Sequence, residues 1–244
     1  MTEKDPHLRK IDLHIHTPKS VCYSDGAATP GEIVKAALSA GLDVIAITDH
    51  NSAAGIEEVQ RAAEGSGLFV LPGIELTTKS GHFLALFDLD IPIEDLNDFL
   101  DYAGIEPGGH GDARTVCSDE TVVTLAKIHE RGGLGIAAHI DRWPSGFLEA
   151  KISRRAKREI HESEFLDALE ITIPETRHEW NNGRVRDFPM KRACIQSSDA
   201  HNPEEIARRP VYVRMETINL GGLKNAFLDY EHAIRFPDDI SGDI

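Results

Sequence analysis

Short apolar runs alternate with segments of helical spacing along most of this 244-residue chain. Each apolar run is short and bounded by polar or turn-forming residues, which predicts a β-strand. Strands are predicted at residues 10–15, 43–48, 68–72, 82–87, 134–139, 167–171, 193–197 and 211–213. Helices are predicted between them, at residues 30–40, 52–64, 93–102, 118–131, 146–163 and 217–230. This alternation is typical of a mostly parallel sheet with helical crossovers, and so many strands in one domain favour a barrel.

The residues at turns and helix ends agree with this division. Thr29 and Pro30 suit the N-cap and the first position of the first predicted helix, and Gly41 suits its end. Two segments without apolar periodicity, 103–114 and 174–192, are predicted as loops, the second as an excursion over the barrel mouth. We expect residues 1–236 to form a single barrel domain and residues 237–244 to be an acidic tail or the stub of a linker.

Composition narrows the class of protein. With 41% hydrophobic and 27% charged residues, the chain has ordinary globular composition. No apolar run approaches the ~18–20 residues of a membrane span, and the first ten residues lack the apolar core of a secretory signal. Cys22, Cys117 and Cys194 lack CxxC spacing, so we expect reduced thiols, interpret Cys22 and Cys194 as packing residues, and predict a cytoplasmic location. A net charge of −15 disfavours non-specific coating of nucleic acid.

The most informative polar pattern is the segment DLHIHT, which begins at Asp12. Because strand side chains alternate between two faces, His14 and His16 lie on the same face, with Leu13 and Ile15 on the other. Two imidazoles a few ångströms apart suit a metal ion better than a core. The alternative is a half-buried strand whose histidines face solvent.

Further metal-binding residue types follow, or open, other predicted strands. In parallel α/β barrels the carboxyl ends of the strands form the active face, so these side chains are expected to converge there. The motifs are Thr48-Asp49-His50, Pro72-Gly73-Ile74-Glu75, a lone His82, Ala137-Ala138-His139 and Ser198-Asp199-Ala200-His201.

In this order, HxH, TDH, PGxE, a lone histidine, AAH and SDAH resemble the PHP family, named for polymerases and histidinol phosphatases. The resemblance spans about residues 10–209. It implies a distorted (β/α)7 barrel with its active site at the carboxyl ends of the strands. It also implies two or three clustered divalent metal ions and the hydrolysis of phosphate esters.

Carried over position by position, the resemblance implies metal ligands at His14, His16, Asp25, His50, Glu75, His82, His139, Asp199 and His201. Glu75 matches the carboxylate that bridges two metals, and His50 and His201 match ligands of a third. Asp25 departs from the pattern of phosphatase-like members, which place this aspartate closer to the HxH pair. The role of Asp25 and the filling of the third site therefore stay open.

The ligand types also restrict the metal. Histidines and carboxylates without a thiolate suit Zn²⁺, Mn²⁺ or Fe²⁺ better than Ca²⁺. Glu75 and Asp199, with Arg142, are the candidate catalytic residues. Arg142 follows the AAH strand, where it is expected either to bind phosphate oxygens or to form a salt bridge with Asp141 or another surface acid. Asp12 and Asp49 are expected to orient imidazoles, with a strand-end cap as the alternative for Asp12.

Three functional hypotheses are consistent with the sequence. The leading hypothesis is a metal-dependent phosphoesterase, either a phosphatase or a nuclease, whose partner is a small phosphorylated substrate such as a nucleotide or a nucleic-acid end. Histidinol phosphate is one substrate that the family allows. The second hypothesis is a PHP module of a larger polymerase- or ATPase-linked protein, with a sensing or structural role. The third, hydrolysis of amide bonds, uses the same ligands.

Overall fold

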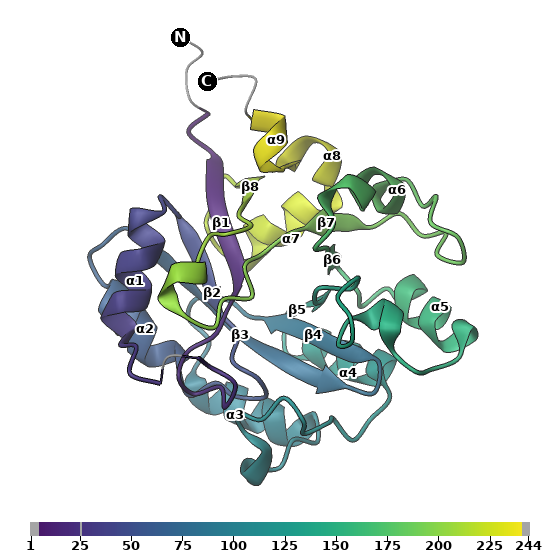
Figure 1. Cartoon of the computed structure of the whole chain (residues 1–244), viewed down its shortest axis with the longest axis horizontal. Coiled ribbons are helices and arrows are strands. Elements are labelled where there is room, and N and C mark those ends of the chain that lie inside the picture. The colour runs from purple at the N-terminus through teal and green to yellow at the C-terminus, as the bar shows by residue number, and fades with distance from the viewer. Residues whose placement is uncertain (1–4, 25, 241–244) are drawn as a thin grey trace.

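The strands of the chain form one mixed sheet in the order β7-β6-β5-β4-β3-β2-β1-β8-β9 (Figure 1). The computed structural model describes residues 5–24 and 26–240. The strands are β1 (Leu8–Ile15), β2 (Val44–Ile47), β3 (Phe69–Thr78), β4 (Gly81–Leu86), β5 (Leu134–Ala137), β6 (Ala168–Glu170), β7 (Ala193–Ile195), β8 (Val211–Arg214) and β9 (Ile234–Arg235). Each predicted strand is present, with ends that shift by a few residues.

The sheet curls until β1 meets the segment that follows β7. The backbone N–H of His16 donates to the carbonyl of Ala200 at 3.0 Å, and the N–H of Ala200 donates to the carbonyl of His14 at 3.3 Å. The amino-terminal part of β1 pairs instead with β8, in antiparallel fashion. Strands β1 to β7 therefore form the nearly closed, distorted barrel that the sequence predicts, while β8 and β9 extend the sheet beyond it.

The expectation of a mostly parallel sheet is wrong around β4, which is antiparallel to both β3 and β5. The reason is local: only Lys79 and Ser80 separate β3 from β4, and a tight hairpin turn cannot return the chain to a parallel position. Gly81 supports the turn with φ +102°, and a Cβ there would lie 3.0 Å from a backbone oxygen. Because β4 is reversed, its first residues lie at the carboxyl end of its neighbours.

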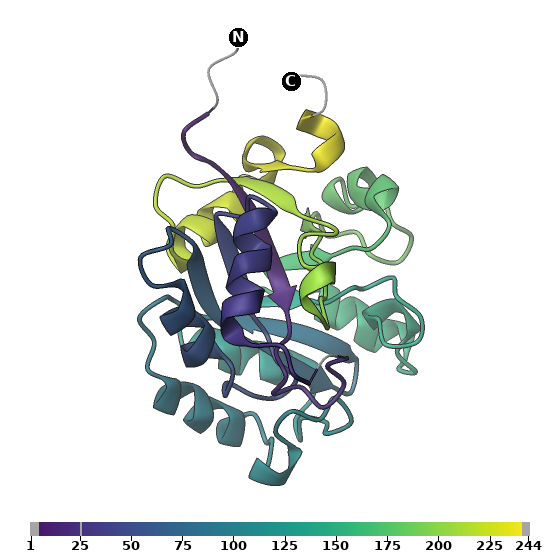
Figure 2. The same cartoon turned by 60° about the vertical axis from the view of Figure 1, so that its left-hand side comes forward.

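Helices cover the outside of the barrel (Figures 1 and 2). They are α1 (Pro30–Ser39), α2 (Ile56–Ala63), α3 (Ile93–Tyr102), α4 (Thr121–Glu130), α5 (Arg154–Glu162), α6 (Arg177–Asn181), α7 (Leu220–Leu228), α8 (Tyr230–Ala233) and α9 (Pro237–Ile240). None of the helices in the described part of the chain is long and apolar enough to cross a membrane.

Three helical segments differ from the sequence expectation. The helix predicted at 146–163 is divided, because Ser153 caps α5 with its side chain and starts the helix there. The expected loop at 174–192 contains α6. Residues 237–240, assigned to the acidic tail, form α9, where Asp239 accepts a hydrogen bond of 2.9 Å from Arg177.

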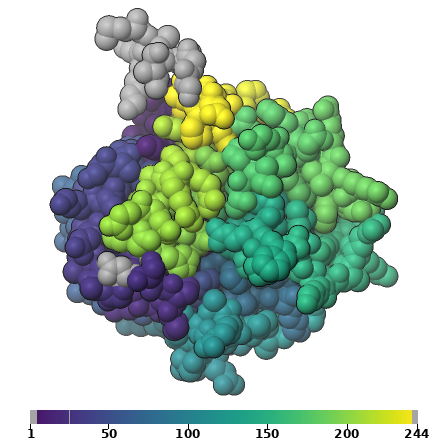
Figure 3. Space-filling view, in the orientation of Figure 1, coloured from purple at the N-terminus to yellow at the C-terminus, as the bar shows by residue number. Residues whose placement is uncertain are grey.

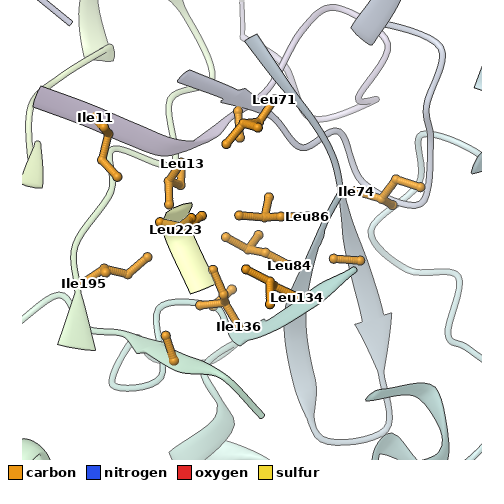
Figure 4. Packing of buried hydrophobic residues seen from close by; sticks show 14 of the residues in the cluster. Ile11, Leu13, Leu71, Ile74, Leu84, Leu86, Leu134, Ile136, Ile195 and Leu223 are labelled. Carbon is orange, nitrogen blue, oxygen red and sulfur yellow. The ribbon is translucent and has the colours of Figure 1, made fainter. Parts of the chain in front are cut away.

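Apolar side chains fill the interior of the barrel (Figure 4). Leu13, Leu84, Leu86 and Ile136 come from three different strands and are fully buried, and Leu223 of α7 lies among them. Burial of such side chains stabilises the fold by ~1.5–3 kcal/mol each. The polar residues of the strands are thus left to the ends of the barrel.

One buried histidine outside the barrel mouth links stability to pH. His161 of α5 is fully buried against Trp180 and Phe188, with ring centroids 5.8 Å and 5.1 Å away. Neither of its ring nitrogens has a hydrogen-bond partner among the described residues. Burial, together with the charge of Arg192, lowers the pKa of His161 to about 4.

We therefore predict that part of the free energy of unfolding is lost as the pH falls from ~6.5 towards 4, because only the unfolded chain takes up this proton. Between pH 7 and pH 4.5 the wild type should lose about 2 kcal/mol more than His161→Leu, measured by urea denaturation. His232→Leu, at a residue with an exposed ring, is the control and should behave as the wild type does. Equal losses in the wild type and His161→Leu would contradict this account.

Candidate metal centre

The residues singled out by motif order converge at one end of the barrel. They lie at the carboxyl ends of parallel strands or, for His82, at the start of the reversed strand β4. The segments that follow β1, β5 and β7 meet on one face of the molecule (Figure 3). Ser24 donates a hydrogen bond of 2.9 Å to the carbonyl of His201, and Arg142 donates one to Asp199.

The carboxylate of Glu75 is at the centre of this cluster and is fully buried. Within the described residues, five imidazoles place a nitrogen 2.9–3.3 Å from its oxygens: His14, His16 and His50 at Oε2, and His82 and His139 at Oε1. Burial alone raises the pKa of a carboxyl group, but here the imidazoles outweigh it and hold the pKa of Glu75 well below its usual value. Glu75 therefore stays ionised.

A second carboxylate, that of Asp199, faces the same histidines. Its Oδ1 lies 3.3 Å from Nε2 of His14 and 3.1 Å from Nε2 of His16, and its Oδ2 accepts a hydrogen bond from Arg142. Asp199 and His139 both have left-handed backbone conformations, with φ of 50° and 29°. Such conformations cost on the order of 1–3 kcal/mol and persist where the surroundings impose them.

The far side of each imidazole in the HxH pair is held by a hydrogen bond that determines its tautomer. Nδ1 of His14 lies 2.8 Å from the carboxylate of Glu170, which can only accept, so this nitrogen carries the proton. Nδ1 of His16 lies 3.0 Å from Oγ of Ser20, whose own proton goes to Asp49 at 2.7 Å. In the neutral form of each ring, Nε2 is therefore the nitrogen left free to bind a cation beside the carboxylates.

This arrangement fits divalent cations. The two Nε2 atoms lie 3.2 Å apart, beside the carboxylates of Glu75 and Asp199, and lone pairs at that distance repel one another unless positive charge separates them. Burial lowers the pKa of His16, but Asp199 and Glu75 outweigh it and raise the pKa to about 9. The pocket therefore demands positive charge, and nitrogen and carboxylate donors suit Zn²⁺, Mn²⁺ or Fe²⁺.

Ligand atoms within 4.8 Å of one another form three overlapping groups: His14, His16, Glu75 and Asp199; His50, Glu75 and His82; and His16, His50 and His201. His50 belongs to two of these groups, and His139, 3.0 Å from Glu75, belongs to none, so the division of the ligands among metals stays a prediction. Asp25, the remaining expected ligand, lies outside the described residues.

Other sequence expectations have mixed outcomes. Asp141 caps the backbone N–H groups of Thr172 and Ile173, so the expected alternative pairing of Arg142 with Asp141 is replaced by the bond to Asp199. Asp49 supports His16 through Ser20, as expected of an orienting residue. Asp12 accepts hydrogen bonds of 2.9 Å from the backbones of Ser198 and Ala207, which is the strand-end cap rather than a contact with an imidazole.

Two orienting residues were missed by the sequence analysis. Glu170 is the one acid inside the apolar run 168–171, and a lone carboxylate near the end of a buried strand is a detectable signal. Ser20 has no comparable signal, because a serine in a loop is an ordinary surface residue. Its importance comes from the turn that places it between His16 and Asp49.

The comparisons with known proteins agree with this geometry. The family model described as PHP domain matches residues 12–163. An uncharacterised protein of Methanocaldococcus jannaschii is 34% identical over 138 residues, which are 53% of this chain and 67% of that protein. A 3′,5′-nucleoside bisphosphate phosphatase of Chromobacterium violaceum is 35% identical over 74 residues, which are 30% of this chain and 25% of the enzyme.

Among solved structures, the lesion-specific endonuclease Q of Pyrococcus furiosus has a similar fold, with a TM-score of 0.69 and 16% identity. The similarity covers 94% of this chain and 57% of the endonuclease chain. The fold, the ordered motifs and the matched model agree, and the chain belongs to the PHP domain family.

Proposed function

We propose that this PHP domain is a metal-dependent phosphoesterase that acts on a small nucleotide or a nucleic-acid end. The observation that carries the proposal is the pair of buried acids, Glu75 and Asp199, with imidazole nitrogens 3.1–3.3 Å from their oxygens. When bound, divalent ions neutralise phosphoryl charge and make water a better nucleophile near neutral pH. A buried, ionised carboxylate such as Glu75 is suited to bridging two such ions, which a neutral imidazole is not.

Side chains of this protein orient the metal-binding histidines and provide a site for the phosphate. Glu170 and Ser20 hold His14 and His16 in the tautomers that leave Nε2 free to bind. The guanidinium of Arg142 lies at the rim, with about a third of the side chain exposed, and contacts Asp199. From there it is placed to bind a phosphate oxygen of an incoming substrate and to balance the charge of Asp199.

The proposed substrate class follows from the residue next to Arg142. Trp143 is 78% exposed, which is unusual for an indole, and it adjoins the proposed phosphate-binding arginine. An exposed aromatic face stacks readily on a nucleobase. By their names, the bisphosphate phosphatase of Chromobacterium violaceum acts on a nucleotide and endonuclease Q on a nucleic acid. The net charge of −15 favours a small substrate over a long polyanion bound along the surface.

A role as a module of a larger protein is the second candidate. It is favoured by the partial coverage of endonuclease Q, in which a fold of this kind makes up 57% of the chain. Metal-dependent turnover by the domain on its own would distinguish an enzyme from a structural module.

The first prediction concerns the bridging acid. Glu75→Gln keeps the shape of the side chain but removes its charge, so bound metal and hydrolysis of an aryl phosphate should fall together, turnover by more than ~100-fold. Metal content by mass spectrometry and turnover with Mn²⁺ or Zn²⁺ are the measurements. Glu159→Gln, on the exposed side of α5, is the matched control and should leave both unchanged. Full turnover by a metal-free Glu75→Gln protein would rule out the proposed mechanism.

The second prediction concerns the orienting acid. Glu170→Gln replaces a pure acceptor by an amide that can also donate to Nδ1 of His14, so the tautomer is no longer fixed. Metal affinity should fall ~10–100-fold, measured by competition with a chelating dye, while the unfolding midpoint of the metal-free protein changes little. An unchanged affinity would show that Glu170 does not orient His14.

The third prediction concerns Trp143. Trp143→Ala should raise KM for a nucleotide by roughly 5- to 100-fold, the equivalent of a stacking energy of ~1–3 kcal/mol, and leave kcat within about twofold. KM for glycerol phosphate, which has no base, should not change. Leu228→Ala, which truncates another exposed apolar side chain, is the control. Equal effects on both substrates would contradict stacking.

A further inference from the structure

A thiol lies against the outermost of the clustered histidines. Sγ of Cys22 is 3.2 Å from Nε2 of His201. Sequence analysis interpreted Cys22 as a packing residue, but it is exposed, whereas Cys117 and Cys194 are buried. The packing interpretation is therefore wrong for Cys22.

The histidine that Cys22 contacts belongs to a group without a carboxylate of its own. The ring of His201 stacks on that of His16 with centroids 4.2 Å apart, and ligand atoms of His16, His50 and His201 lie within 4.8 Å of one another. His50 is 5% exposed, and its Nδ1 faces Oε2 of Glu75 at 2.9 Å, which holds the ring beside His16 and His201. Three imidazoles whose ligand atoms lie this close together fit a cation bound between them.

The backbone fixes the thiol in this position. The N–H of Tyr23 donates to the carbonyl of Ser20 at 3.0 Å, which forms a turn around Cys22. On its other side, the N–H and Oγ of Ser24 both donate to the carbonyl of His201, at 2.9 Å and 2.7 Å. The loop is therefore tied to the same residue whose ring the thiol faces.

We propose that Cys22 is a thiolate ligand of a divalent ion held with His50 and His201, which makes the third site of this chain a mixed histidine–cysteine site. The proposal rests on the metal-dependent function proposed above. On binding, the thiol loses its proton to solvent and the sulfur bonds to the ion. A thiolate supplies one negative charge to a group of neutral imidazoles.

The ligand type gives this site a preference that the others lack. Thiolates favour Zn²⁺, Co²⁺ and Fe²⁺ over Mn²⁺ and Mg²⁺. Without an ion, burial and the acids Glu75 and Asp199 raise the pKa of Cys22 to about 11, so the thiol is protonated at neutral pH. A nearby cation reverses this effect, since it stabilises the thiolate.

Cobalt reports sulfur ligation directly. Metal-free protein reloaded with Co²⁺ should show a sulfur-to-cobalt charge-transfer band in the near ultraviolet. Cys22→Ser should lose this band and bind one equivalent less Co²⁺, while Cys117→Ala should keep both. The same Cys22→Ser change should weaken the last Zn²⁺ equivalent more than tenfold and leave Mn²⁺ binding within twofold.

Thiol protection is the second readout. At alkaline pH, where a fraction of the thiol is ionised, iodoacetamide should alkylate Cys22 of the metal-free protein. Saturating Zn²⁺ should slow this reaction at least tenfold, whereas Mg²⁺ should not. The modified residue is identified by peptide mass spectrometry.

The outcomes separate the two proposals. If Co²⁺ binds without the band, or if Cys22→Ser keeps the band, the ligand role of Cys22 is overturned and the proposed metal-dependent function stands. If the wild type binds no Co²⁺ at all, both proposals are overturned.

Discussion

The structure of this end of the barrel depends on one energetically unfavourable feature, the burial of the Glu75 carboxylate. An ion in a low-dielectric interior is unstable unless opposite charge or several hydrogen-bonding groups surround it. Here the compensation comes from imidazoles on β1, β4 and the segments after β2 and β5. Each of these strands must end at the correct height for its histidine to reach Glu75. The lengths and positions of the barrel strands are therefore constrained by the contacts of the histidines with Glu75.

The reversal of β4 shows how the fold serves this constraint. In an all-parallel barrel, the first residue of a strand lies at the end away from the active face. The two-residue turn before Gly81 reverses the strand and brings His82 to within 2.9 Å of Glu75. A departure from regular architecture thus adds a ligand at a position that a regular barrel would leave to the opposite end.

Much of this arrangement was predictable from the sequence because side chains alternate between the two faces of a strand with a two-residue period. His14 and His16 could be placed on one face, and the remaining motifs at strand ends, from pattern alone. The direction of β4 was not predicted, since the apolar run was expected to end at Pro72 and the turn lies beyond it. The partners of His14 and His16 depend on tertiary contacts across 156 residues for Glu170 and on a local turn for Ser20. Neither kind of contact produces a periodic pattern in the amino-acid sequence.

The seam between β1 and the segment after β7 has a consequence for how the chain completes its fold. His14 and His16 stand on one side of the seam and Asp199 and His201 on the other, whereas few backbone hydrogen bonds join the two sides. A cation shared by both sides would act as a cross-link between segments that are distant in the chain, and closing such a large loop is entropically expensive. A bound ion would therefore stabilise the seam, where few backbone hydrogen bonds join the two segments. In this protein, hydrogen exchange of the β1 amides would therefore report both metal binding and the closure of the barrel.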